Sequence, residues 1–530
     1  MKKFLIISLQ LILCLSLGFG QVKVVNILDF GAVPDGHTVN TNAIQRAIDE
    51  AHRTGGGKVI IPTGRFVTGS IVLKSHVNLY LNQGAVLLGS TDPSDYFEMD
   101  FPGRPTAIKQ DDNSQMALIL AHKARHITVA GEGTIDGQGL PLALAIDSLH
   151  HAGIAIDPRY NYRRNRPSET MRPKLFRFSQ CTDVQISGLK VGSSACWGLS
   201  FELSHNLRLS DLTIVNRSFW NNDGIDITDC TNVQVTNCNV NAADDGICLK
   251  SYYEGYANDS IYIANCTIRS SASAIKFGSA SFGGFRNIII EGIRVFDTFR
   301  SAIAIESVDG AQIENVSVTD VIAKNTGNAL FIRLGHRSGD HPGVVRNIIF
   351  RDMRIQIAFE RPDSEYDLRG PEVDFFHNPF PASIVGLENQ SIEDVSFENI
   401  ELIYPGRASK AMAYVPITRL SQVPENTSKY PEFSMFGELP SWGFFIRHAK
   451  GITFSDVRLK VLDEDFRPAV LCDDVQGISM NQVEIQPAKP SDRQIVLNES
   501  TVIKRQAIHI QGVSGDGIFH VEQSEQFQAK

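Results

Sequence analysis

The sequence is poor in the features that mark several large classes of protein. Basic side chains are not in excess: 59 Asp and Glu outnumber 50 Lys and Arg, which argues against a nucleic-acid partner. Beyond residues 1–20, no apolar run is long enough to span a bilayer. With 42% hydrophobic and 21% charged residues, the chain of 530 residues has the composition of a globular protein with a large core, which excludes a disordered chain.

Cysteines are few, and their spacing is not that of a metal site. Seven follow the N-terminal segment, an odd number for a disulfide framework, and no histidine-rich partner set accompanies them. We therefore expect no metal site at these positions and predict that the cysteines behave as small buried apolar residues. The seven are Cys181, Cys196, Cys230, Cys238, Cys248, Cys266 and Cys472.

The N-terminal segment is typical of a secretory signal peptide. Lys2 and Lys3 precede an apolar run that begins at Phe4, and small residues follow up to Gly20. We expect cleavage near Gly20, which predicts a secreted or periplasmic protein.

A short pattern recurs along the chain: apolar, any residue, Asn/Asp/Gly, apolar, any residue, apolar. Most successive copies start 23 to 28 residues apart, and the longer steps carry insertions. The copies are "ISGLKV" at 186, "LSDLTI" at 209, "VTNCNV" at 235, "IANCTI" at 263, "IEGIRV" at 290, "IENVSV" at 313, "FRDMRI" at 350, "FENIEL" at 397, "FSDVRL" at 454 and "MNQVEI" at 480.

Each repeat has room for short β-strands joined by turns, but most have no room for a helix. One repeat cannot bury its apolar face alone, whereas stacked repeats form a continuous core with coils ~4.8 Å apart. The sequence therefore predicts an all-β, right-handed parallel β-helix. A β-sandwich is the alternative, and it would show hairpin turn signals rather than one repeated polar corner.

A second set of repeats lies in the same coils. The segments "DGIDI", "DGICL", "SAIKF" and "SAIAI" align from Asp223, Asp245, Ser273 and Ser301, at spacings that match the coil length. Asp223 and Asp245 should therefore occupy equivalent corners of adjacent coils, with Asp244 beside them. This places three carboxylates on one exposed face of the β-helix.

The two ends of the chain differ from its middle. Residues 41–66 read as an amphipathic helix followed by a glycine-rich turn and a strand, which would cover the open end of the solenoid. We divide the chain into the signal peptide at 1–20, an N-terminal cap with the first coils at 21–100, the catalytic β-helix at 101–485 and a β-rich tail at 486–530.

Three aspartates on one face can supply the general acid and the water-activating bases of glycoside hydrolysis. Closely packed like charges raise the pKa of at least one carboxyl group, which keeps a proton available. Asp-Gly is also a common turn dipeptide, so a structural role is the alternative for each copy alone. Metal binding by the cluster, as in calcium-dependent lyases, is a further alternative.

The segments "NNDGID" and "ADDGICLKS", together with the opening "ILDFGAVPDGHTVNTNAIQRAI", resemble glycoside hydrolase family 28, the polygalacturonase family. The family's Asn-Thr-Asp motif corresponds to Asn221, Asn222 and Asp223, and its Asp-Asp motif to Asp244 and Asp245. The resemblance implies an inverting mechanism with Asp244 as the general acid. It also implies that Asp223 and Asp245 activate the attacking water and that Asn221 contacts the substrate.

Two motifs of the family are absent. The chain has "ASA" at 272–274 in place of Gly-His-Gly, and "AIE" at 304–306 in place of Arg-x-Lys. In typical members those basic residues hold the galacturonate carboxylate. The coil alignment offers Lys250, Lys276 and Arg333 as replacements in neighbouring coils, all pointing outward.

Other candidate substrate contacts lie outside the repeats. The loop "RLGHRSGDHPG" contributes His336 beside Arg333, and the long insertion at 420–445 should wall the cleft. For each of the basic residues, a solvated surface side chain is the alternative.

Together these features predict a secreted glycoside hydrolase that cleaves a galacturonate-containing linkage of a pectin-type polysaccharide. We expect the enzyme to be a monomer that binds a polysaccharide or oligosaccharide and uses neither a metal nor a cofactor. A β-helical polysaccharide lyase and a non-catalytic carbohydrate-binding β-helix are the alternatives. The lyase would need a metal and a strong base, whereas the binding protein would tolerate loss of the three aspartates.

Overall fold

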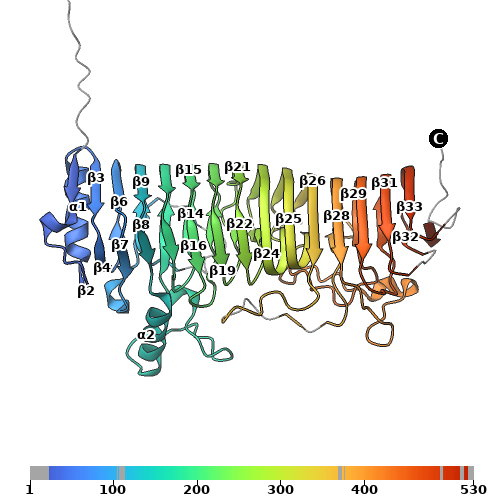
Figure 1. Ribbon diagram of the computed structural model, residues 1–530, viewed down its shortest axis with the longest axis horizontal. Helices are drawn as coiled ribbons and strands as arrows, with labels where there is room; N and C mark the ends of the chain where they lie inside the picture. Colours follow the sequence, from blue (N-terminus) through green and yellow to red (C-terminus); the bar gives the residue numbers. More distant parts are fainter. Residues whose placement is uncertain are drawn as a thin grey trace, which may run out of the picture.

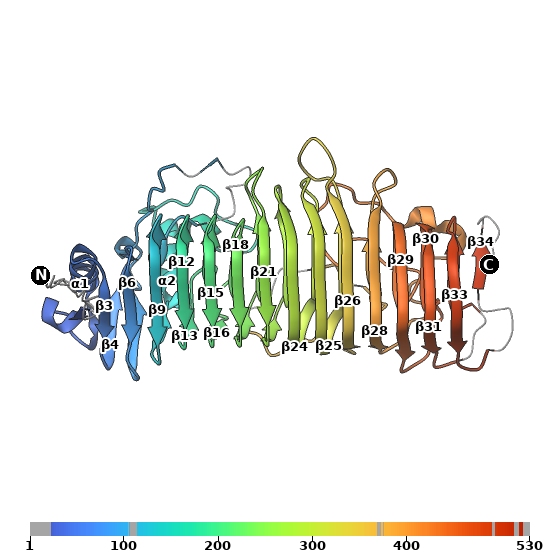
Figure 2. The same ribbon diagram turned by 90° about the horizontal axis from the view of Figure 1, so that it is seen from above.

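The chain forms a long right-handed parallel β-helix, which Figures 1 and 2 show from two sides. The computed structural model describes residues 23–103, 105–106, 114–367, 373–374, 376–489 and 493–513, and the backbone of 519–522. The expected signal peptide lies outside these described residues. No helix within them has the length and apolar character needed to cross a membrane.

Three parallel ladders of strands run along the β-helix, and each coil contributes to them in turn. The first ladder begins with β1 (Val24–Asn26), β3 (Gly57–Ile61), β6 (Val77–Leu81), β9 (Arg125–Gly131), β12 (Thr182–Ser187), β15 (His205–Ser210), β18 (Thr231–Thr236) and β21 (Asn258–Ala264). The second begins with β2 (Asp35–Val39), β4 (Gly64–Thr68), β7 (Ala85–Gly89), β10 (Thr134–Asp136), β13 (Lys190–Gly192), β16 (Thr213–Asn216), β19 (Asn239–Ala242) and β22 (Thr267–Ser270).

The third ladder carries the pocket described below. It contains β5 (Ile71–Val72), β8 (Ala117–His122), β11 (Lys174–Ser179), β14 (Leu199–Glu202), β17 (Ile225–Thr228), β20 (Ile247–Ser251), β23 (Ile275–Ser281), β27 (Ala382–Val385), β30 (Val470–Gln476), β32 (Ile495–Asn498) and β34 (Phe519–Glu522). Longer strands turn corners and serve more than one ladder: β24 (Gly284–Ser307), β25 (Gln312–Leu334), β26 (Val344–Ile357), β28 (Ile392–Tyr404), β29 (Phe444–Val461), β31 (Ile478–Gln486) and β33 (Val502–Ile510).

Helices are confined to the end and one side of the β-helix. Helix α1 (Thr41–Arg53) buries Ala43, Ile44, Ala47 and Ile48, as predicted, and covers the N-terminal coil. Helix α2 (Gly139–His151) lies in an insertion that projects from the side. Short 3₁₀ turns are η1 (Ile27–Phe30), η2 (Pro93–Asp95), η3 (Glu169–Met171) and η4 (Ile417–Gln422).

The backbone conformation explains why the sequence pattern repeats Asn, Asp or Gly at its third position. At the third position of all ten repeats the chain turns a corner with positive φ, for example 55° at Asn237, 53° at Asn265 and 65° at Gly292. Only Gly, and to a lesser extent Asn and Asp, adopt this conformation at low cost. The pattern therefore marks one corner of each coil.

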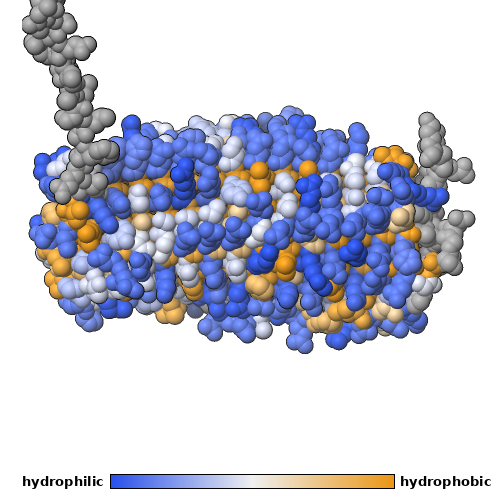
Figure 3. All heavy atoms as spheres, turned by 45° about the horizontal axis from the view of Figure 1, so that its top comes forward, coloured by the Kyte–Doolittle hydropathy of each residue, from blue (hydrophilic) through white to orange (hydrophobic). Residues whose placement is uncertain are grey.

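Apolar side chains inside the coils stack in continuous columns. Ile225, Ile247, Ile275 and Ile303 pair in register across four coils and are almost fully buried. All seven cysteines of the described chain are free and buried, which confirms the prediction that they are small buried residues. The outer surface in Figure 3 is mostly hydrophilic, with apolar side chains in short patches and stripes.

Two adjacent residues of β24 offer a matched test of this register. Ile290 is fully buried, whereas Ile289 is 48% exposed. Ile290→Ala should lower the free energy of unfolding by ~2–5 kcal/mol, because it leaves a cavity in the core. Ile289→Ala should change it by about 0.5 kcal/mol or less. Urea unfolding of the two variants measures both values, and equal losses would contradict the register.

Candidate functional site

A pocket of about 910 Å³ opens on the third ladder, where β17, β20 and β23 begin. One wall comes from the insertion between β28 and β29, which contributes residues from Val415 to Glu438, as the sequence predicted for this long segment. Glu169 and Trp197 also line the pocket. The α2 insertion and the insertion before β29 project from the same side of the β-helix (Figure 1).

The three predicted aspartates line this pocket together. Gly198 N–H donates to the carbonyl oxygen of Asp223, and Gly224 N–H donates to that of Asp245, each at 3.0 Å, so the two aspartates occupy equivalent corners of adjacent coils. Their predicted exposure, however, is wrong. Asp223, Asp244 and Asp245 are only 4%, 8% and 4% exposed, because the flanking insertions enclose this part of the face.

Lys250 pairs with Asp223, the aspartate at the first of these corners. Its ammonium donates to Asp223 Oδ2 at 3.0 Å and also to Asp226, which lies one coil before Cys248 in the same outward column. Burial, and next the charge of Asp223, raise the pKa of Asp226 well above its ordinary value. Ligand atoms of Asp223, Asp226 and Cys248 lie within 4.8 Å of one another, but the ammonium of Lys250 already bonds to both carboxylates.

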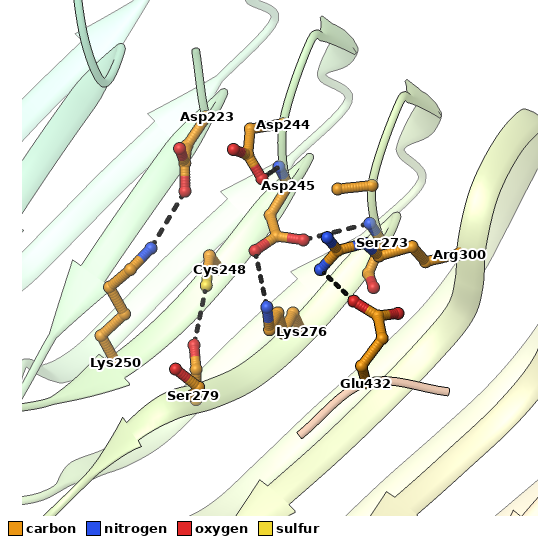
Figure 4. Close-up of polar contacts among 12 residues, drawn as sticks. Asp223, Asp244, Asp245, Cys248, Lys250, Ser273, Lys276, Ser279, Arg300 and Glu432 are labelled. Carbon is orange, nitrogen blue, oxygen red and sulfur yellow. Dashed lines mark hydrogen bonds and ion pairs between the residues drawn. The ribbon is translucent and has the colours of Figure 1, made fainter. Parts of the chain in front are cut away.

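Lys276 pairs in the same way with Asp245, the aspartate at the second corner. Its ammonium lies 3.1 Å from Asp245 Oδ2 and donates to the Tyr430 hydroxyl at 2.9 Å. The backbone N–H of Ser273 donates to Asp245 Oδ1 at 3.0 Å (Figure 4). The predicted lysine therefore lies in the pocket, but its charge is already paired with a pocket aspartate.

Neighbouring charges push the pKa values of Asp244 and Asp245 apart. Burial, followed by the charges of Asp223 and Asp245, raises the pKa of Asp244 to about 7. Burial also opposes ionisation of Asp245, but Lys276, Lys250 and Arg300 outweigh it and hold the pKa of Asp245 below its ordinary value. Near neutral pH, the pocket thus keeps a proton available on Asp244 and a charge on Asp245.

Two further charged residues of the pocket were missed from the sequence. Arg300 forms an ion pair of 2.7 Å with Glu432 (Figure 4). Arg300 immediately precedes Ser301, as Asp244 precedes Asp245, so the coil alignment contained a signal for it. Glu432 lies in the insertion before β29, where no repeat could indicate its position.

The remaining predicted contacts are divided between the pocket and its surroundings. Asn221 lines the pocket, and its side-chain oxygen accepts a hydrogen bond from Arg172 at 2.7 Å. Arg333 is fully buried beneath the insertion and donates to backbone carbonyls of Gly386 and Glu425. His336 bonds to the Gly339 carbonyl oxygen on an exposed loop. The structure does not bring Arg333 or His336 into the lining of this pocket.

This arrangement can transfer a proton to one atom while removing a proton from another. Asp244 holds a proton near pH 7, whereas Asp245 remains charged and hydrogen-bonded beside it. Two carboxyl groups with opposite pKa shifts are what acid–base cleavage of a glycosidic bond requires.

Comparisons of the sequence and of the structure with known proteins indicate the same family. The model of glycosyl hydrolases family 28 matches residues 74–333, and the model of rhamnogalacturonase A/epimerase, pectate lyase-like, matches residues 24–118. A "Probable polygalacturonase" of Vitis vinifera is 28% identical over 338 residues, covering 62% of this chain and 60% of that protein.

An "Exo-poly-alpha-D-galacturonosidase" of Dickeya chrysanthemi is 26% identical over 313 residues, which cover 51% of this chain and 50% of that protein. The chain thus aligns with about half to three fifths of these two relatives. Among solved structures, an exopolygalacturonase from Thermotoga maritima shares the fold, with a TM-score of 0.57 and 20% identity over 83% of this chain and 93% of that one.

The buried lysine–aspartate contacts predict a stability effect. Lys250→Met leaves Asp223 and Asp226 without their cation, so it should lower the free energy of unfolding by ~3–5 kcal/mol at neutral pH. The loss should shrink at low pH, because Asp226, whose pKa is raised by burial, is then protonated and no longer needs a cation. Lys190→Met, at an exposed position, is the control. Urea unfolding at neutral and acidic pH measures the effect, and an unchanged Lys250→Met variant would contradict this role of the ammonium.

Proposed function

Because the chain belongs to glycoside hydrolase family 28, we propose that it hydrolyses a galacturonate-containing linkage of a pectin-type saccharide with inversion. The observation that carries this proposal is the pair Asp244 and Asp245, adjacent in one pocket with pKa values shifted in opposite directions. The signal-like segment at residues 1–20 supports action outside the cytoplasm.

In the proposed reaction, Asp244 is the general acid. Its proton passes to the glycosidic oxygen as the bond from that oxygen to the anomeric carbon breaks. A water molecule attacks the anomeric carbon from the opposite face and loses a proton to the carboxylates of Asp223 and Asp245. Water adds across the bond, and the configuration at the anomeric carbon inverts.

Lys250 and Lys276 support this division of roles as positioning residues. Each ammonium holds one of the proposed bases, at 3.0 Å from Asp223 and 3.1 Å from Asp245. The contact with Lys276 favours the ionised form of Asp245, which burial would otherwise protonate. The same contacts weaken the calcium-dependent lyase alternative, because Lys250 already supplies positive charge to Asp223 and Asp226.

Replacing Asp244 by Asn should remove the proton donor with little change in size. General acid catalysis contributes ~10²–10⁴-fold, so kcat on an unactivated pectic oligosaccharide should fall by at least that factor. Product formation measured by chromatography checks this, with the exposed Asp340→Asn as a control and the thermal midpoint as a test of folding. Near wild-type turnover by Asp244→Asn would contradict the proposed acid and favour a different site or a binding role.

The pH dependence of kcat/KM provides a separate test. Activity should fall as pH rises above about 7, because Asp244 then loses the proton it must donate. On the acidic side, activity should fall only below the ordinary pKa of an aspartate, where Asp245 gains a proton. Lys276→Met removes a cation that lowers both pKa values, so both limbs of the profile should move to higher pH.

The exposed Lys190→Met variant should leave both limbs in place. If Lys276→Met lowered activity without moving either limb, Lys276 would not set the ionisation of the proposed acid and base.

A further inference from the structure

The side of the pocket that follows the catalytic aspartates along the β-helix has an unusual charge distribution. Its lining contains Lys276 on β23, Arg300 on β24, and Tyr430 and Glu432 from the insertion, and Glu306 on β24 lies next to Gly278 of the same lining. Figure 4 shows Lys276, Arg300 and Glu432 grouped around Asp245. This is the region where the absent Arg-x-Lys motif would place two cations.

The cations of this region already have anionic partners. Lys276 pairs with Asp245 at 3.1 Å, and Arg300 pairs with Glu432 at 2.7 Å. On the neighbouring coil, Lys250 pairs with Asp223 and Asp226. The one other cation among the described lining residues, Lys429, is exposed, so water hydrates and screens its charge.

In the described structure, Arg300 Nε is a buried donor without a hydrogen-bond partner, and Glu306 also has unused hydrogen-bonding capacity. It is 3% exposed, and its Oε2 atom is buried without a hydrogen-bond partner in the described structure. That atom lies near Gly278, which lines the pocket: a Cβ added to Gly278 would lie 3.6 Å from Glu306 Oε2. A buried, unpaired carboxyl oxygen is costly, and a ligand that donates a hydrogen bond would remove that cost.

We propose that this side of the pocket, with Glu306, Glu432 and Tyr430, binds an uncharged sugar residue through its hydroxyl groups. The inference rests on the proposed function and refines it: the cleaved linkage would join a galacturonate to a neutral sugar rather than to a second galacturonate.

The energetics of the two kinds of sugar differ at this position. A uronate carboxylate brought against Glu306 and Glu432 would lose its hydration without gaining a free cation, which is unfavourable. A sugar hydroxyl can donate to the carboxyl oxygens and accept from the Tyr430 hydroxyl. Burial raises the pKa of Glu306 to about 8, so near neutral pH the group also has a proton to donate to a sugar oxygen.

Binding to the inactive Asp244→Asn variant tests the inference without relying on turnover. Calorimetry would compare digalacturonate with two matched disaccharides in which one galacturonate at a time is replaced by galactose. These ligands differ only in the carboxylate at C6. One of the two mixed disaccharides should bind at least ~10-fold more tightly than digalacturonate. Digalacturonate binding as tightly as both mixed ligands, or more tightly, would overturn the inference.

Variants at Glu306 assign the preference to this residue. In the Asp244→Asn background, Glu306→Lys supplies a cation and should shift the affinity ratio toward digalacturonate by at least ~10-fold. Glu306→Gln keeps a neutral hydrogen-bonding side chain of similar shape and should keep the preference for the mixed ligand. The control is Glu132→Lys, an equal charge change at an exposed position outside the pocket lining. A ratio that Glu306→Lys leaves unchanged, in a variant with the parent's thermal midpoint, would overturn the role of Glu306.

The two proposals fail in different ways. If the wild type cleaved none of these ligands or their longer homologues, the proposed hydrolase activity would fail, but the calorimetric preference would still decide the inference about the neutral sugar. If the wild type cleaved digalacturonate with a kcat/KM equal to or above that for both mixed disaccharides, the hydrolase would stand and the neutral-sugar inference would fall.

Discussion

The register between stacked coils is the constraint on which the rest of this structure depends. Parallel pairing places equivalent residues of successive coils ~4.8 Å apart, and a shift by one residue would exchange the inner and outer faces. The same register that aligns Ile225, Ile247 and Ile275 in the core aligns Asp226, Cys248 and Lys276 on the outer face. Packing of the core therefore fixes the positions of the charged groups in the pocket.

That fixed geometry gives three neighbouring carboxylates different environments. Lys250 and Lys276 each contact a different aspartate, whereas Asp244 has neither ammonium as a direct partner. The side-chain oxygen of Asp244 accepts a hydrogen bond from the backbone N–H of Asp245 at 3.0 Å. Burial by the flanking insertions then makes ionisation of Asp244 costly, because three adjacent charges would share one enclosed space.

Much of this arrangement could be predicted from the sequence because it repeats. The positive-φ corner favours Asn, Asp or Gly, which occupy it in nine of the ten repeats, with Gln482 in the tenth. The coil period is therefore visible in the residues, and it locates Asp223 and Asp245 together. Residues outside the period carry no such signal. Glu432 and Tyr430 come from an insertion, and its packing over the third ladder encloses aspartates that the repeat alone would leave exposed.

The basic residues predicted to replace the absent Arg-x-Lys motif show the same limit of prediction from the sequence. Strand alternation correctly predicts that Lys250 and Lys276 point outward, but it does not reveal which acids they meet. Both lysines contact pocket aspartates, and Arg333 is held beneath the insertion by backbone carbonyls. Pairing between side chains from different coils depends on distances that a list of residue types does not contain.

In the proposed reaction, the carboxylates of one pocket cleave a glycosidic bond by direct attack of water. Proton NMR of the first product formed from a pectic oligosaccharide, recorded before mutarotation, distinguishes this reaction from its alternatives. The new reducing end should first appear with the anomeric configuration opposite to that of the cleaved linkage. A product with retained configuration, or an unsaturated sugar formed by elimination, would contradict it.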